Sequence, residues 1–201
     1  MDDPLNYVGI DPGFLGGIAV IDGFGVPQVW PLPITDKGGR RGKEYDLGAL
    51  NVRFRVIKSR YPSHDIGLEW GTSRPGEVPE SARRYGVGMG QLEGLMWAHR
   101  LNHERVNPVT WKKKLGLKGK TKKGWEGQSA AVFKLFYPNH MDLITGPRDG
   151  LKDGLCDALL IAHYMRMQTL AGLTSIKETC DDTARQALLL GFGRTKFKGF
   201  S

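Results

Sequence analysis

Two short runs of apolar residues near the start of the chain predict neighbouring buried strands. They cover residues 6 to 12 and 16 to 21, and glycines stand in and beside the link between them. Glycine allows a tight connection, so we expect the two strands to follow each other closely. A third strand near residues 28 to 32 would complete an antiparallel meander, and the glycine-, arginine- and lysine-rich segment 35 to 44 predicts a loop.

Further along the chain, the spacing of apolar residues changes between the periods of helices and strands. The elements predicted there are helices over residues 47 to 61, 79 to 102, 128 to 137 and 151 to 169, and strands at 65 to 70 and 104 to 107. Together with the first three strands, they predict an α/β fold in which a mixed five-stranded sheet is flanked by helices.

In two segments, the apolar residues follow neither the helical nor the strand period. Residues 111 to 127 are rich in lysine and glycine and are predicted to form a basic loop. Residues 191 to 201 are predicted to be a frayed basic tail. No break in composition precedes this tail, so we expect residues 1 to 190 to form a single domain.

The charge of the chain indicates which kind of molecule it binds. Lys and Arg total 29 against 21 Asp and Glu, a net charge of +8 that suits nucleic acid. No run reaches the roughly 18 apolar residues of a membrane span, and the start of the chain lacks a signal-peptide pattern, so we expect a soluble cytoplasmic protein. The glycine-rich link lacks the lysine of a P-loop, and two cysteines cannot form a four-ligand zinc site by themselves. Neither a nucleotide cofactor nor zinc is expected.

Four acidic residues stand in apolar surroundings, where a charge adds nothing to solubility. Asp11 ends the first strand, and Glu69 ends the apolar run Ile66-Gly67-Leu68. Asp153 and Asp157 are four residues apart on the last predicted helix, so they share a face and repel each other unless a cation lies between them. Carboxylates in such positions are unfavourable unless they are paired or bound to metal.

Phosphodiester hydrolysis needs this kind of residue. Two divalent ions roughly 3.5–4 Å apart generate the attacking hydroxide and stabilise the leaving oxygen. Mg²⁺ prefers oxygen ligands and keeps water and substrate phosphate in its octahedron. The four carboxylates therefore predict a site for two Mg²⁺ ions, with Mn²⁺ as a substitute. Taken singly, Asp11 also fits a plain Asp-Pro-Gly turn, Glu69 an edge-strand charge, and either helical Asp a cap.

The segments around these carboxylates resemble the RuvC-like Holliday junction resolvases of the RNase H-like superfamily, particularly the phage and mitochondrial branch. The similarity spans roughly residues 7 to 166. Its specific parts are residues 8–13 (VGIDPG), 68–69 (LE) and 152–159 (KDGLCDAL), and its weaker parts are residues 81–94 and 108–112. The resemblance implies an RNase H-like fold, a homodimer, and symmetrical nicking of four-way DNA junctions. A phage protein would act in the host cytoplasm.

The resemblance also implies roles for the four acidic residues. Asp11 would bridge both ions, Glu69 and Asp157 would hold one each, and Asp153 would complete the set. Some family members space the last acidic pair three residues apart, but position 154 is glycine here, which leaves Asp153 as the candidate.

A second departure follows the glutamate. Bacterial members carry a phenylalanine just after it, which wedges the junction open, whereas Trp70 stands here. Either Trp70 or Arg74 would take that role, or the protein would be less selective for four-way junctions.

A basic surface is the remaining candidate for contact with DNA. Seven lysines lie between residues 112 and 123, bordered by Trp111 and Trp125, a pattern that favours tracking of phosphates over a merely solvated face. In the family pattern Lys112 and Lys123 fall near catalytic lysines, and the sequence leaves open which of them contacts the scissile phosphate. The other DNA-binding candidates are Arg74, Arg83, Arg84, Lys113, Lys118, Lys120 and Lys122.

These features predict a structure-selective DNA endonuclease that resolves Holliday junctions or other branched DNA by two-metal-ion hydrolysis. Two alternatives stay open: an RNase H-like nuclease acting on RNA–DNA hybrids, and a non-catalytic protein that binds branched nucleic acid. The four carboxylates disfavour the second alternative, because without a metal they would repel phosphate.

Overall fold

The computed structural model describes residues 5–36, 42–71, 78–117, 128–146 and 150–189, with side chains described as far as residue 172. The central sheet has the strand order β3-β2-β1-β6-β7. Its strands are β1 (Asn6–Ile10), β2 (Gly17–Ile21), β3 (Pro27–Pro31), β6 (His64–Glu69) and β7 (Glu104–Val106). β1, β2 and β3 pair antiparallel, whereas β6 runs parallel to both β1 and β7. The predicted mixed five-stranded sheet is confirmed.

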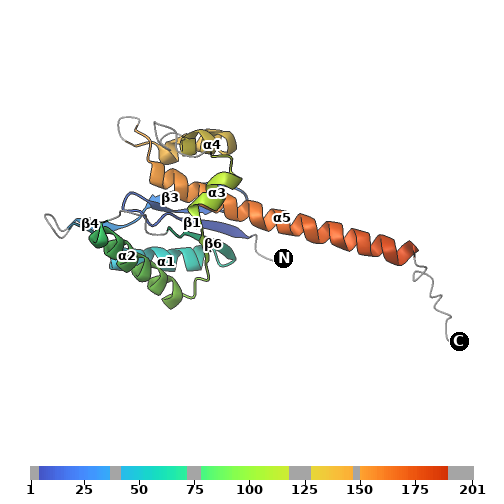
Figure 1. Cartoon of the computed structure of the whole chain (residues 1–201), viewed down its shortest axis with the longest axis horizontal. Coiled ribbons are helices and arrows are strands. Elements are labelled where there is room, and N and C mark those ends of the chain that lie inside the picture. The colour runs from blue at the N-terminus through green and yellow to red at the C-terminus, as the bar shows by residue number, and fades with distance from the viewer. Residues whose placement is uncertain (1–4, 37–41, 72–77, 118–127, 147–149, 190–201) are drawn as a thin grey trace. The chain divides into compact units, whose positions relative to one another are not determined.

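Helices cover both faces of this sheet (Figure 1). On one face lie α1 (Leu47–Arg60) and α2 (Pro79–Ala98), and on the other lies the first part of α5 (Asp153–Leu189). The described residues also form the shorter helices α3 (Pro108–Lys114) and α4 (Gln128–Phe136) and the 3₁₀ helix η2 (Pro138–Ile144). The predicted α/β architecture is therefore also confirmed.

The alternation of side chains along β1 divides the core into two layers. Val8 and Ile10 are fully buried in the cluster that the sheet forms with α1 and α2. α1 contributes the three apolar residues that its period predicted: Leu50, Phe54 and Ile57. Gly9 points the other way, toward α5.

Two glycines bring α5 directly onto the central strands. A Cβ at Gly9 would lie 2.1 Å from the carbonyl oxygen of Ala158, and a Cβ at Gly67 would lie 2.9 Å from the side chain of Met165. Gly9 and Gly67 are register partners on β1 and β6. Because neither residue carries a side chain, α5 can pack against the middle of the sheet, with its backbone at Gly9 and its side chains at Gly67.

The structure corrects two of the predicted loops. Residues 108–114, of which 111–114 were assigned to the basic loop, form α3, in which Asn107 is the N-cap and Pro108 follows it in the first turn. This pair is a helix start signal, which the lysine-rich composition obscured. Both ends of the predicted loop 35 to 44 belong instead to a two-stranded sheet, in which β4 (Ile34–Asp36) pairs with β5 (Lys43–Tyr45); residues 37–41 lie outside the described residues.

The last helix is longer than its apolar spacing predicted. α5 continues to Leu189 instead of ending near residue 169. Residues 1–166 form one compact unit, and residues 167–201 are assigned to a second one. The predicted domain end at residue 190 stays a prediction, and the predicted tail, 191 to 201, lies outside the described residues. None of the described helices has the length and apolar character needed to cross a bilayer.

Candidate metal-dependent nuclease site

The ends of the two central parallel strands place Asp11 beside Glu69. The register pairs Gly9 with Gly67 and Ile10 with Leu68, so positions 11 and 69 come next. Side chains alternate along a strand, so Asp11 and Glu69 share the α5 face with Gly9 and Gly67. The prediction that these two strand carboxylates face the last helix agrees with this geometry.

Asp157 approaches the same place from α5. It directly precedes Ala158, whose carbonyl oxygen packs against Gly9, two residues before Asp11. The charge of Asp157 acts on Asp11 together with the charge of Glu69. Three of the four predicted carboxylates therefore gather at one end of the parallel strands.

The surroundings of Asp11 make its ionisation unfavourable. Burial, followed by the charges of Glu69 and Asp157, raises the pKa of Asp11 from 3.8 to about 7. The backbone N–H of Gly13, which donates to Asp11 Oδ1 at 2.9 Å, and the nearby Lys112 act in the opposite direction. A surplus of negative charge of this kind attracts a cation.

Lys112 supplies positive charge at this place. Its Nζ donates to Asp157 Oδ2 at 2.9 Å, and only 16% of either side chain is exposed. Burial alone would lower the pKa of Lys112, but Asp157, Glu69 and Asp11 outweigh it and raise the pKa above its ordinary value. Of the two lysines left open by the sequence, Lys112 is thus placed among the carboxylates, whereas Lys123 lies outside the described residues.

Two neutral donors at the site were missed by sequence reasoning. The indole Nε1–H of Trp111 donates to Glu69 Oε2 at 2.9 Å, and the hydroxyl of Ser129 donates to Asp157 Oδ1 at 2.6 Å. Trp111 was predicted to border a surface that tracks phosphates, but it is fully buried. The signal that could have indicated this burial is the helix start at Asn107 and Pro108, which places Trp111 on a helix rather than in a loop.

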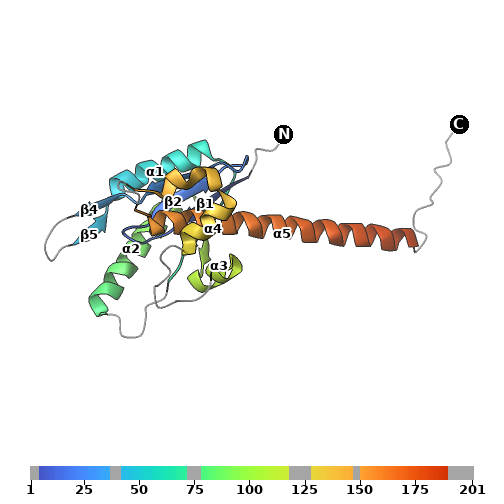
Figure 2. The same ribbon diagram turned by 90° about the horizontal axis from the view of Figure 1, so that it is seen from above.

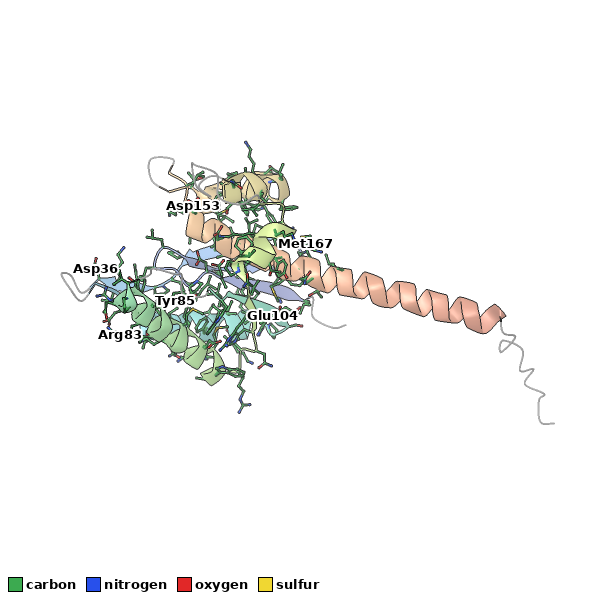
Figure 3. All side chains as sticks on the ribbon, viewed as in Figure 1. Asp36, Arg83, Tyr85, Glu104, Asp153 and Met167 are labelled. Atoms are coloured by element: carbon green, nitrogen blue, oxygen red, sulfur yellow. The ribbon has the colours of Figure 1, made fainter. Side chains whose placement is uncertain are left out.

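Asp153 is placed differently from the other three carboxylates. It lies exposed in the first turn of α5, one turn before Asp157 (Figure 3). Position 154 cannot carry a ligand in this fold, because a Cβ at Gly154 would lie 2.3 Å from the carbonyl oxygen of Leu15. The glycine that departs from the family spacing is therefore needed for the helix to meet the loop after β1.

The donor chemistry of the site fits Mg²⁺. Carboxylate oxygens are the ligands that this ion prefers, and a divalent ion would relieve the repulsion that raises the pKa of Asp11. Within the described ranges, no three His, Cys, Asp or Glu side chains stand close enough to hold a metal as they are placed. The carboxylate side chains would have to move closer together to bind an ion.

The chain is similar to known proteins in its three-dimensional structure. No protein-family model and no curated protein sequence matches the chain. Among solved structures, Thermus thermophilus RuvC in complex with a Holliday junction substrate matches with a TM-score of 0.55 at 18% identity, covering 84% of this chain and 96% of that one. A second T. thermophilus RuvC structure matches with a TM-score of 0.51 at 19% identity, covering 83% and 96%.

The chain has the fold of RuvC. The expected RNase H-like fold is therefore confirmed. The yeast mitochondrial Holliday junction resolvase Ydc2 is also similar, at 21% identity and a TM-score of 0.45, covering 90% of this chain and 84% of that one.

Trp70 follows Glu69 at the position where bacterial RuvC-like proteins are expected to carry their wedge. The guanidinium of Arg105 lies 3.7 Å from the centre of the Trp70 ring. Arg105 in turn makes two hydrogen bonds to Glu93, at 2.8 and 2.9 Å. These contacts hold Trp70 against β7, and Arg74, the other candidate, lies outside the described residues.

The candidate DNA-binding residues lie at separate places in this RuvC fold. Arg83 and Arg84 lie on α2, where both donate to Glu80 at 2.9 Å, and Figure 3 shows Arg83 and Asp153 on opposite sides of the sheet. Lys113 is exposed on α3, which lies beside the first turns of α5 in Figure 2. The remaining candidates, Lys118, Lys120 and Lys122, lie outside the described residues.

Proposed function

We propose that this protein is a metal-dependent endonuclease that resolves Holliday junctions or related branched DNA. The observation that carries the proposal is the gathering of Asp11, Glu69 and Asp157 around Lys112 at the ends of the parallel strands. The RuvC fold supports it, since a T. thermophilus protein of that fold is found in complex with a Holliday junction substrate. The net charge of +8 suits the same polyanionic partner.

Each residue of the site has a proposed role. Asp11, Glu69 and Asp157 would hold two Mg²⁺ or Mn²⁺ ions, with Asp153 completing the set from the exposed turn of α5. When bound, such ions activate water and stabilise the leaving oxygen of a phosphodiester. The ammonium of Lys112, which the carboxylates keep protonated, would bind the scissile phosphate as negative charge builds on it.

We also propose that two chains form a homodimer through α2. Cleavage at two symmetric places of a four-way junction needs two sites related by a two-fold axis. Val87 and Trp97 are exposed on α2 by 50% and 63%. Gly86, Gly90 and Gly94 recur at every fourth position. Apart from their neighbours in α2, no atom of the described residues lies within 4 Å of where a Cβ would stand, so a second helix could approach closely.

By helical spacing alone, the expected contact on α2 is the face that carries Val87, Gln91 and Leu95. Leu95 instead packs partly against the core of its own chain. We therefore place the proposed dimer contact on the face of α2 that carries the three glycines, and not on the face that carries Leu95.

A cleavage assay tests the proposed function. Purified protein is incubated with a labelled four-way junction, an RNA–DNA hybrid and a linear duplex, each with and without Mg²⁺. We expect paired nicks in the junction that depend on the metal. Asp11→Asn should bind the junction as well as the wild type or slightly more tightly, but should not cut it, because a ligand and a repelling charge are both lost.

Asp142→Asn is a matched control, because Asp142 is an exposed carboxylate on η2. It should cut like the wild type. Cleavage by Asp11→Asn at the wild-type rate would refute the proposed site. Preferential cutting of the hybrid would favour an RNase H-like activity, and binding of the junction without any cutting would favour a non-catalytic role.

A further inference from the structure

Two buried side chains hold carboxylates of the proposed site without adding charge. Trp111 is fully buried and its Nε1 is 2.9 Å from Glu69 Oε2. Ser129 is 3% exposed and its Oγ is 2.6 Å from Asp157 Oδ1. Each donor therefore binds a different carboxylate where water has little access.

Trp111 is suited to fix an ionised glutamate. An indole N–H can only donate, so when buried it needs an acceptor, and the carboxylate of Glu69 supplies one. The large ring is also held by the surrounding core, so it fixes the position of the oxygen that it contacts.

Ser129 and Lys112 divide the two oxygens of Asp157 between them. The hydroxyl of Ser129 binds Oδ1, and the ammonium of Lys112 binds Oδ2 at 2.9 Å. Lysine is a flexible side chain whose charge competes with a metal ion. The hydroxyl is short, buried and neutral, so it can orient Asp157 while leaving its charge for the ion.

Both donors lie on helices outside the sheet, and α3 begins two residues after β7 ends. Trp111 and Lys112 are successive residues of α3, separated by about 100° around the helix, and they reach Glu69 and Asp157 respectively. Ser129 lies in the first turn of α4. Placing α3 and α4 thus sets the orientation of carboxylates on β6 and α5.

We propose that Trp111 and Ser129 are positioning residues, which orient Glu69 and Asp157 for the binding of divalent metal. This inference rests on the proposed metal-dependent nuclease function. Replacing a residue that hydrogen-bonds to a metal ligand commonly lowers metal affinity or activity about 10–100-fold.

The test compares Trp111→Phe and Ser129→Ala with the wild type. Phenylalanine keeps an aromatic ring and removes the N–H, and alanine removes only the hydroxyl. Calorimetry with Mn²⁺ measures metal affinity without any cleavage. We expect each variant to bind Mn²⁺ about 10–100-fold more weakly. The Mg²⁺ concentration for half-maximal junction cleavage should rise in parallel, with much of the rate recovered at saturating Mg²⁺.

Matched controls separate positioning from general damage. Trp30→Phe alters a partly buried tryptophan that packs against the main core, and Ser59→Ala removes a hydroxyl bonded to the carbonyl oxygen of Val56. Neither should change Mn²⁺ affinity. Ser129→Thr, which restores a hydroxyl, should bind Mn²⁺ more tightly than Ser129→Ala. If Trp111→Phe fails to fold, as thermal melting would show, the comparison at Ser129 still decides.

The outcomes distinguish the two proposals. A wild-type protein that neither binds Mn²⁺ nor cuts junctions would overturn the proposed function itself. A wild-type protein that does both, alongside variants with unchanged Mn²⁺ affinity and Mg²⁺ dependence, would overturn only the positioning role. A loss of rate that is the same at every Mg²⁺ concentration, with Mn²⁺ affinity unchanged, would also count against positioning.

Discussion

Replacing Asp11 with asparagine should stabilise the metal-free protein at pH 8. The pKa of Asp11 lies near 7 in the folded protein against an ordinary value of 3.8, chiefly because of burial and of the charges on Glu69 and Asp157. At about 1.4 kcal/mol for each pH unit, this difference corresponds to about 4 kcal/mol of lost stability once Asp11 is ionised. Asparagine is neutral and has an oxygen that can still accept the N–H of Gly13.

The direction of the pH dependence follows from the raised pKa. Below about pH 4, Asp11 is protonated in the folded and the unfolded chain, so the wild type loses nothing. Between pH 4 and 7 the unfolded chain releases the proton first, and the stability of the wild type falls as the pH rises. The advantage of Asp11→Asn should therefore grow over this window and stay constant above it.

Thermal and urea unfolding with a chelator present, at pH 4, 6 and 8, measure this advantage. Relaxation around the charge reduces the full value, and even about 2 kcal/mol would raise the Tm by about 4–8 °C at this chain length. Added Mg²⁺ should stabilise the wild type, by about 2.7 kcal/mol at a hundred times its Kd, and should have less effect on Asp11→Asn. Asp142→Asn is the control.

One result would refute this reasoning. If Asp11→Asn were no more stable than the wild type at pH 8 in chelator, Asp11 would not be a strained carboxylate. The repulsion among Asp11, Glu69 and Asp157 would then give no reason to expect a cation at the site.

Three further variants test the lysine, the dimer and the basic segment. Lys112→Met should lower the single-turnover cleavage rate about 10²-fold or more while changing junction affinity little, and a loss confined to affinity would exclude contact with the scissile phosphate. Gly90→Leu on the open face of α2 should give a monomer by light scattering with an unchanged or higher Tm, and a persistent dimer would place the contact elsewhere. Replacing Lys118, Lys120 and Lys122 together by alanine should flatten the plot of log K against log salt by up to about 0.9 per lost contact, whereas an unchanged slope would leave these lysines as a solvated segment.

The spacing of apolar residues along the sequence determined the strands of the sheet and the main helices that flank it. Apolar runs and helical spacing depend on neighbouring residues, so they could be read without knowing the fold. The same pattern showed that Asp11 and Glu69 follow buried strands. It could also place Asp157 on an apolar helix, since a charge in such surroundings is visible from the sequence alone.

Some local signals were present but were outweighed by composition. Asn107 and Pro108 mark the start of α3, yet the lysines that follow favoured a loop. The hairpin of β4 and β5 is similarly short, and the glycine- and charge-rich segment between its strands dominated the pattern. In α5, the apolar face predicted an end near residue 169, although the backbone stays helical to Leu189.

Only the tertiary structure decided which side chains meet at the site. The bonds from Trp111 to Glu69, Lys112 to Asp157 and Ser129 to Asp157 join residues that are 42, 45 and 28 positions apart in the chain. No local period encodes such pairs, because they depend on how α3 and α4 pack beside α5. Gly9 and Gly154 show the same limit, because the sequence shows only that they are small. In the fold, α5 contacts β1 at Gly9 and the loop after β1 at Gly154. These contacts bring Asp157 close to Asp11.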